Sequence, residues 1–416
     1  MIVKKPKGTH DILPDEIYKW QNIEKKYFDI CTRFGYKEIR LPVFEHTELF
    51  QRGVGNTTDI VQKEMYTFND KGNRSITLRP EGTAGVARSF IENGMNVMPQ
   101  PVKLCYNITA YRYENVQKGR YREFHQLGLE AFGVENANLD VEVISLLNLF
   151  LQDVGLKNCS LSINSIGCPT CRKEYNEKLR EFLAPKLDQL CPLCQDRYNK
   201  NPLRILDCKN EKCNEITKEA PLLADCLCEE CNTHFEKVKN GLENLGINYT
   251  IDKKIVRGLD YYTKTVFEFV SNEIGAQSAV CGGGRYDGLI EECGGKPTPG
   301  IGFAVGLERL LLLLESQNVE IKDENTTDVY IASIDNTREY VEKLVYKLRC
   351  NKVNASYDLA EKSLKAQMKY ADKINAKYTV VIGENEISTN KCELKNMATG
   401  EKREINLNDI INELAK

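Results

Sequence analysis

The chain has 416 residues, 28% of them charged, and a formal net charge of -3. This length allows two or three domains with full-sized cores. The near-neutral charge excludes a general attraction to nucleic acid, so local patches must hold any polyanion. The N-terminus MIVKKPKGTHDILPDE lacks the apolar core of a signal peptide, and the leucine run LERLLLLLE is too short to span a bilayer. We therefore expect a cytoplasmic protein without a membrane partner.

The first region, to about residue 158, mixes helices with strand-like segments. The periodicity predicts helices at 15–35, 82–94 and 139–155 and strands at 37–44, 64–70, 75–80, 102–111 and 127–133. Strands outnumber the helices that could serve as crossovers. The sheet should therefore be mainly antiparallel.

The second region, 165–245, is helical, rich in Lys and Glu and dotted with cysteines. It reads as an insertion, because strand and glycine-rich sequence resumes after it. The charged stretch VEIKDENTTD then predicts a linker, and strands alternate with helices beyond it. We predict an α/β chain with an α+β first domain, 1–325, that carries a helical insertion, 165–245. A small separate α/β domain, 326–416, completes it.

The loop of the hairpin YRYENVQKGRYREFHQLGLEAFG carries four cations where a tight turn would favour Gly, Asn or Asp. They are Arg112, Lys118, Arg120 and Arg122. The chain has no phosphate-binding loop of the type GxxxxGK[ST], no GxSxG motif, and only four histidines with which to build a triad or a metal site. An arginine-built anion site is the interpretation that remains.

Beyond this loop, alternation places Gln126, Gly128 and Glu130 on one face of a strand and the intervening apolar residues in the core. A solvated strand face would give the same pattern. A second polar and aromatic segment, RGLDYYTKTVFEF with Arg257, Tyr261 and Tyr262, favours one shared pocket.

Together these segments resemble the histidyl-tRNA synthetases, which are class II aminoacyl-tRNA synthetases. The first class II motif would be FGYKEIRLPVFEHTELF with Pro42, the second the quoted hairpin, and the third GIGFAVGLERLLL with Arg309. The segments RGLDYYTKTVFEF and CGGGRYDGL are those peculiar to the histidine enzyme, and TLRPEGT matches its amino-acid-binding segment. The resemblance covers nearly the whole chain and implies a class II antiparallel sheet flanked by helices.

The resemblance implies a ligase that activates L-histidine with ATP to histidyl-adenylate and then charges tRNA(His). In such a reaction two anions approach, which requires cations fixed where charge develops. By resemblance, Arg112 and Arg257 are catalytic and flank the α-phosphate. Arg112, Arg120 and Arg309 bind ATP, which Mg2+ should accompany. Arg122 and Lys118 are better explained as solvated loop charges or contacts to the acceptor end of tRNA.

The resemblance also implies a histidine pocket. Glu81, Thr83 and Gln126 would take the α-amino group, although Glu81 also fits the start of a helix. Glu130 and Tyr262 would read the imidazole nitrogens, and Tyr261 and Tyr286 would line the walls. A site that demands two ring N–H donors rejects isosteres that lack them.

The cysteines concentrate in the insertion. By spacing, CPTC and CPLC fit a four-thiolate zinc site of Cys168, Cys171, Cys191 and Cys194, and DCKNEKC with CLCEEC could supply a second. Against zinc, some members of the family build this insertion without such cysteines. Ordinary reduced core cysteines are the alternative.

The last domain carries a lysine series at helical spacing, consisting of Lys362, Lys365, Lys369 and Lys373. Most such faces are only solvated, but in this family the domain binds the anticodon, so we interpret the series as a phosphate contact to tRNA. Class II enzymes of this type pair through the first motif, which predicts a homodimer. The alternative function is a non-catalytic regulatory paralogue serving the histidine-biosynthetic ATP phosphoribosyltransferase, which should lack the last domain and some of the arginines.

Overall fold

The structure is a computed structural model that describes residues 3–55, 58–208, 210–253, 255–271, 273, 279–323 and 326–414. The chain forms two compact units, Met1–Ile321 and Lys322–Lys416. Within the segment interpreted as a linker, residues 324 and 325 lie outside the described residues. The two units are described separately.

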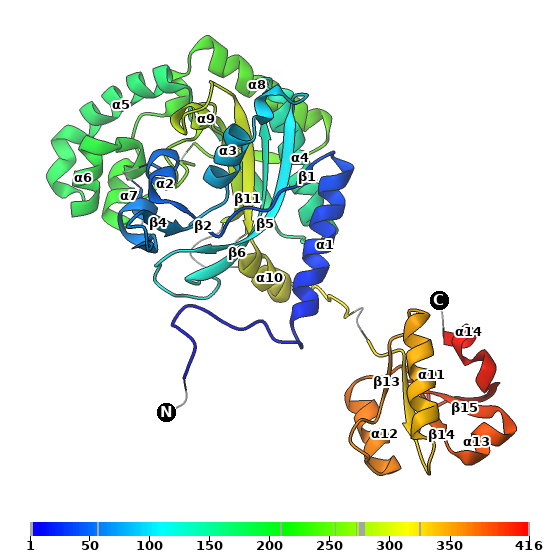
Figure 1. Cartoon of the computed structure of the whole chain (residues 1–416). Helices are drawn as coiled ribbons and strands as arrows, with labels where there is room; N and C mark the ends of the chain where they lie inside the picture. The colour runs from blue at the N-terminus through cyan, green and yellow to red at the C-terminus, as the bar shows by residue number, and fades with distance from the viewer. Residues whose placement is uncertain are drawn as a thin grey trace. The chain divides into compact units, whose positions relative to one another are not determined.

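A large sheet, in which β1, β5, β6 and β11 are labelled in Figure 1, forms the centre of the first unit. It has eight strands in the order β1-β5-β6-β11-β10-β9-β7-β8. Its strands are β1 (Lys37–Glu38), β5 (Val102–Tyr111), β6 (Glu123–Phe132), β7 (Ser160–Ser165), β8 (Tyr249–Ile251), β9 (Thr263–Val270), β10 (Ala279–Arg285) and β11 (Gly300–Gly306). Only the outermost pairs, β1 with β5 and β7 with β8, are parallel. The prediction of a mainly antiparallel sheet is confirmed.

The segment 37–44 differs from the single strand predicted for it. It divides into β1, at the edge of the large sheet, and β2 (Phe44–His46). The latter joins a three-stranded sheet with β4 (Ser75–Leu78) and β3 (Thr67–Asn69). Pro42 lies between β1 and β2, and a proline has no N–H with which to continue a strand ladder.

The helices cover both faces of the large sheet. One core cluster joins it to α1 (Ile17–Arg33), α4 (Ala137–Asp153), α8 (Glu229–Asn244) and α10 (Leu307–Ser316). The other face packs against α3 (Thr83–Glu92), α9 (Leu289–Glu292) and the insertion, and α2 (Thr47–Gly53) lies beside α3 and α9. Among the described helices, none has both the length and the apolar composition that crossing a membrane requires.

The insertion is helical, as predicted. It consists of α5 (Pro169–Leu183), α6 (Pro192–Lys200) and α7 (Glu211–Thr217) with short 3-10 turns, and it ends in α8. The strand before it, β7, pairs with β8 and β9 after it. The sheet is therefore built from segments on both sides of the insertion.

The second unit is a five-stranded sheet in the order β13-β12-β14-β15-β16, with helices packed on it. The strands are β12 (Val329–Ser333), β13 (Ala355–Tyr357), β14 (Tyr378–Ile382), β15 (Lys391–Asn396) and β16 (Lys402–Asn406). The helices are α11 (Arg338–Cys350), α12 (Leu364–Lys373), α13 (Glu384–Thr389) and α14 (Ile410–Leu414). The alternation of strands and helices predicted for this region is confirmed.

Candidate active site

A cavity of about 240 Å³ opens on the sheet face that carries α3 and the insertion. Its lining includes eight of the residues predicted for the site, namely Glu81, Thr83, Arg112, Gln126, Arg257, Tyr261, Tyr262 and Tyr286. They come from the start of α3, the hairpin, the segment before β9 and the end of β10. Segments that are far apart in the sequence therefore converge on one pocket.

Glu130 on β6 is not itself in the cavity lining; it is only 1% exposed and lies behind three lining residues to which it is hydrogen-bonded. Thr83 and Tyr106 donate hydroxyl hydrogen bonds to its Oε1 at 2.8 and 2.9 Å, and Tyr286 donates to its Oε2. Burial raises the pKa of Glu130 to about 8, although the three hydroxyls oppose that shift. The carboxyl is thus an acceptor that the fold holds in place and that is costly to ionise without further donors.

Tyr106 was not predicted as a site residue. It lies opposite Gly128 in the β5–β6 register, and its ring covers that glycine so closely that an added Cβ would come 2.1 Å from the ring. The glycine at the centre of the polar strand face therefore makes room for a tyrosine that positions Glu130. A tyrosine within the apolar strand VKLCYNITAY gave no signal of this role.

Glu81 caps the start of α3. Its carboxylate accepts the backbone N–H of Thr83 at 2.7 Å and that of Ala84 at 2.8 Å. Burial raises its pKa, and these N–H groups oppose the shift. Glu81 therefore both caps the helix and lines the pocket, so the two interpretations of this residue are compatible.

Arg257 lines the same cavity and pairs with Glu268 of β9. Burial is the largest single effect and opposes its charge, but the Glu268 carboxylate together with Tyr262 and Tyr261 outweighs it, so the pKa of Arg257 is raised. Its guanidinium lies 5.6 Å from the centre of the Tyr262 ring. Arg257 is therefore a fixed, fully charged cation at the pocket wall. Glu268 was missed because nothing in the sequence distinguishes it from other strand carboxylates.

Two polar atoms in the pocket have no hydrogen-bond partner among the described residues. They are the buried Oε1 of Gln126 and the buried Nε of Arg257. Buried polar groups in folded proteins are nearly always paired. Both residues line the cavity, so one unpaired acceptor and one unpaired donor lie in its wall.

A second cavity of about 160 Å³ adjoins the first and shares Arg112 and Gln126 with it. Arg120 and Arg309 also line it, together with Glu114 and Gly119. Glu114 contacts both loop arginines, Arg112 at 3.7 Å and Arg120 at 3.2 Å. Burial and the Arg120 cation lower the pKa of Arg309. An anion bound between these arginines would relieve their repulsion.

The other two cations of the hairpin loop are outside this lining. The Arg122 guanidinium stacks 3.6 Å from the centre of the Tyr113 ring, and its backbone N–H donates to Gly8. Lys118 is exposed. Neither residue therefore lines the second cavity, and a contact to tRNA stays a prediction.

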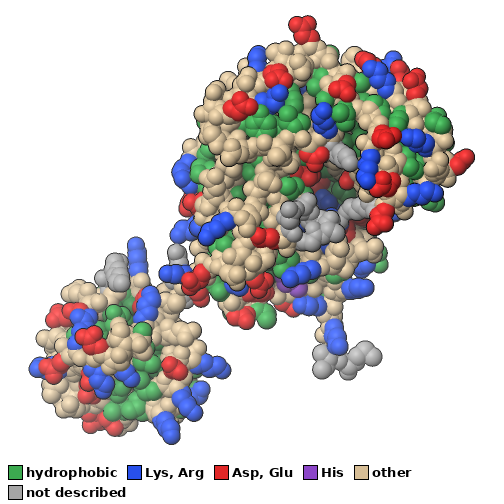
Figure 2. All heavy atoms as spheres, turned by 180° about the vertical axis from the view of Figure 1, so that it is seen from behind, with side chains coloured by type: hydrophobic (Ala, Val, Ile, Leu, Met, Phe, Trp, Pro, Cys, Tyr) green, Lys and Arg blue, Asp and Glu red, His purple; other side chains and the backbone are tan. Residues whose placement is uncertain are grey.

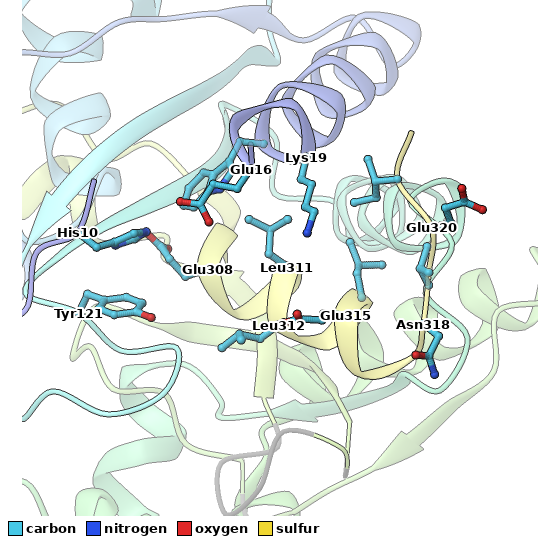
Figure 3. A pocket seen from close by; sticks show the side chains of 14 residues that line it. His10, Glu16, Lys19, Tyr121, Glu308, Leu311, Leu312, Glu315, Asn318 and Glu320 are labelled. Atoms are coloured by element: carbon cyan, nitrogen blue, oxygen red, sulfur yellow. The ribbon is translucent and has the colours of Figure 1, made fainter. Parts of the chain in front are cut away.

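A larger hollow, of about 470 Å³, lies between α1 and the outer side of α10. Figure 3 shows Lys19 there among carboxylates, which are Glu16, Glu308, Glu315 and Glu320. This acidic lining repels phosphate. The smaller, arginine-lined cavity is therefore the one suited to a nucleotide.

The cysteines group differently from the predicted pairing of CPTC with CPLC. The structure brings Cys168 and Cys171 together with Cys228 and Cys231, and Cys191 and Cys194 together with Cys208 and Cys213. The four cysteines predicted as one site are thus divided between two clusters. The prediction joined the two CxxC motifs that follow each other in the sequence. In the fold, the first motif instead pairs with the last, and the cysteines between them form the second cluster.

Of the four lysines in the second unit, Lys365, Lys369 and Lys373 lie exposed on α12. Lys362 precedes the helix, and its ammonium group is 5.7 Å from the centre of the Tyr370 ring. The lysine series therefore extends one turn beyond the helix itself. Figure 2 shows basic and acidic side chains interspersed over the visible face of the molecule, in keeping with the near-neutral charge.

Known proteins have similar sequences and structures over both units. Residues 8–310 match the family Histidyl-tRNA synthetase, and residues 328–416 match the family Anticodon binding domain. The chain is 65% identical over 415 residues to the Histidine--tRNA ligase of Acetivibrio thermocellus, with 100% of each chain covered. It is 53% identical over 418 residues to that of Clostridioides difficile, covering 100% of this chain and 99% of the relative.

Among solved structures, apo histidyl-tRNA synthetase of S. aureus superimposes with a TM-score of 0.86 at 44% identity, and each chain is covered in full. The matches span both units and include the segments that build the two cavities. The chain belongs to the histidyl-tRNA synthetase family.

Proposed function

We propose that this chain is a histidine–tRNA ligase that joins L-histidine to ATP as histidyl-adenylate, releases pyrophosphate, and transfers histidine to the 3' end of tRNA(His). The observation that carries this function is the pair of adjoining cavities. One is walled by tyrosines above a buried carboxyl, the other by three arginines, and they share Arg112 and Gln126. An amino acid and a triphosphate bound side by side would meet at the shared residues.

The histidine pocket supplies orientation and selectivity. Glu130 and Tyr262 read the imidazole nitrogens, Glu81, Thr83 and Gln126 hold the α-amino group, and Tyr261 and Tyr286 form the walls. Support comes from the hydroxyls of Thr83, Tyr106 and Tyr286, which fix Glu130. Ring N–H groups that reach this carboxyl would lower its cost of ionisation, and a ligand without them would leave it unpaired.

The arginines act on the phosphates. Arg112 donates through Nε to the Pro80 carbonyl at 2.8 Å, and its side chain lines both cavities. We assign it to the carboxylate and the α-phosphate, Arg257 to the α-phosphate from the pocket side, and Arg120 and Arg309 to the outer phosphates. A guanidinium fork suits bidentate contact with phosphate oxygens. Mg2+ accompanies ATP, and the cysteine clusters of the insertion lie outside the lining of both cavities.

The regulatory alternative is not favoured. Arg112, Arg257 and Arg309 are all present, and residues 328–416 match the Anticodon binding domain. We expect ATP–pyrophosphate exchange that depends on L-histidine and on no other amino acid. Exchange with none of the amino acids, from protein that is folded, would overturn the function.

For the second unit we propose anticodon binding through the α12 lysines. A chain ended near residue 325 should still form adenylate and lose most tRNA charging, because the phosphate contacts of this unit are removed. Equal charging by the shortened and full chains would contradict this role.

We also propose a homodimer that pairs through the segment around Pro42, in the cytoplasm where tRNA is charged. Val43 and Phe44 beside this proline are 41% and 58% exposed, which gives the segment an apolar surface to bury. Sedimentation at micromolar concentration should show a dimer, and a monomer alone would count against it.

A further inference from the structure

Eight cysteines of the insertion form two clusters, and in each cluster the four sulfurs all lie within 4.8 Å of one another. Cys168 and Cys171 have their sulfurs 3.6 Å apart, and Cys191 and Cys208 have theirs 3.8 Å apart. These separations are far longer than a disulfide bond of about 2.05 Å. Among the described residues, which include every cysteine, no disulfide forms.

The sulfur separations fit a tetrahedral metal ion. Four sulfurs bound at about 2.3 Å around Zn2+ stand about 3.8 Å apart along each edge of the tetrahedron. The cysteines that hold an iron–sulfur cube bind different iron atoms, so their sulfurs lie farther apart. Thiolate ligands select soft or borderline metals over Mg2+ or Ca2+.

The backbone around each cluster is arranged to support thiolates. The N–H of Cys228 donates to the Cys171 sulfur at 3.1 Å, and that of Cys191 donates to the Cys213 sulfur at 3.3 Å. Cys168, Cys191 and Cys228 each occupy the N-cap of a helix, where the helix dipole favours negative charge. Such N–H donors orient metal ligands in the same way.

We propose that the insertion binds two Zn2+ ions, one held by Cys168, Cys171, Cys228 and Cys231 and the other by Cys191, Cys194, Cys208 and Cys213. Both sites are structural, because four thiolates complete the tetrahedron and leave no open position. The first joins the beginning of the insertion to its end. The second lies wholly within the loop that the first closes.

The two sites have a task beyond the insertion itself. Arg172, next to Cys171, donates to the Tyr262 carbonyl at 3.1 Å, and Arg204, near Cys208, donates to the Arg257 carbonyl at 2.8 Å. The parts of the insertion around the two cysteine clusters therefore hold opposite ends of the RGLDYY segment, which lines the histidine pocket. Loss of either ion should loosen one end of this segment.

The test is a count of metal ions by elemental analysis and native mass spectrometry on the full chain, purified without chelator. We expect two zinc ions per chain. C168S/C228S should retain one ion, because both substitutions fall in one site. C168S/C191S should retain none, because they fall in different sites. Cys226→Ser is the matched control, since Cys226 is a buried cysteine of the insertion outside both clusters, and it should retain two.

Retention of one ion by C168S/C191S would overturn the grouping, and iron in place of zinc would overturn the identity of the metal. Wild-type protein without metal would overturn the sites altogether. Cobalt substitution of the wild-type chain gives a readout that does not depend on the variants folding. It should produce the thiolate-to-cobalt charge-transfer band of a tetrahedral four-sulfur site at two equivalents, and absence of that band would also refute the proposal.

Discussion

The histidine pocket and the nucleotide cavity adjoin each other but are built differently. Glu130, Tyr106 and Tyr286 of the pocket come from strands or strand ends and are at most 1% exposed. In the nucleotide cavity, Arg112 and Arg120 belong to a hairpin loop, with side chains 18% and 35% exposed. The Glu130 carboxyl of the pocket is already hydrogen-bonded without a ligand, whereas the nucleotide cavity holds like charges close together.

This difference separates selectivity from charge neutralisation. A carboxyl fixed by three hydroxyls in a packed sheet can discriminate among amino acids, because a poor ligand cannot move it aside. Phosphate groups differ little between nucleotides. A phosphate site therefore depends more on positive charge at the ends of long side chains than on a rigid shape. Each of the following changes tests one side of this contrast.

The largest effect is expected at Arg257, the cation assigned to the α-phosphate from the pocket side. Arg257→Ala should slow adenylate formation by a factor on the order of 100 to 1,000, because one preorganised cation at the developing charge is lost. Histidine binding should fall much less. Arg257→Lys restores charge without the fork and should recover only part. Pre-steady-state adenylate formation measures the rate, and near-normal activation by the alanine variant would refute the assignment.

On the pocket side, Glu130→Gln should reduce kcat/KM for histidine by about 10- to 100-fold, the range for losing a hydrogen bond to a charged group. The KM for ATP should hardly change. Glu123→Gln on the same strand, outside the pocket lining, is the control. If kcat/KM fell equally for ATP and for histidine in exchange assays, the histidine pocket and the nucleotide cavity would not act as separate sites.

On the nucleotide side, Arg120→Ala should raise the KM for ATP by about tenfold, as expected for one charge-assisted contact. Histidine affinity should stay the same. Arg122→Ala is a matched control in the same loop, since its guanidinium stacks on Tyr113 outside the cavity. If both variants changed the KM for ATP alike, the loop would act through general charge and not through placed contacts.

The last prediction concerns stability and pH, and not catalysis. The pKa of Glu130 is raised by burial from 4.5 to about 8. Between these values the folded chain binds more protons than the unfolded chain, so stability falls as pH rises through this window. Glu130→Gln lacks this contribution. The difference in denaturation midpoint between this variant and wild type should therefore grow in favour of the variant as the pH is raised from 5 to 8. A difference that stays constant over this range would show that Glu130 does not have the raised pKa.

Much of the pocket could be predicted from sequence because strand alternation and family motifs both point to the same residues. Gln126 lines the cavity, and Leu127, Leu129 and Ala131 are fully buried, as the alternation requires. The role of Tyr106 could not be predicted. A tyrosine at a core position of a strand fits the same alternation pattern whether it only fills space or also positions a carboxyl. Only the opposing Gly128, in a register that the sequence does not state, reveals its role.

The cysteine grouping failed for a related reason. Spacing identifies a CxxC motif as a ligand pair but says nothing about which second pair it meets across the fold. Likewise, Pro42 interrupts a segment whose apolar pattern alone resembles one strand. Long-range partners are properties of the topology, and local patterns do not contain them.

The nested cysteine clusters also bear on how the large sheet forms. Leu161 of β7 pairs with Tyr249 of β8 across the whole insertion, so this contact must close a long loop. A crosslink between Cys168 and Cys228 would shorten that loop. Because loop-closure entropy grows only with the logarithm of length, the gain is about 1 kcal/mol. Crosslinking by the first cysteine cluster therefore lowers the entropy cost of pairing β7 with β8 only slightly, and the packing of the insertion on the sheet matters more than loop closure.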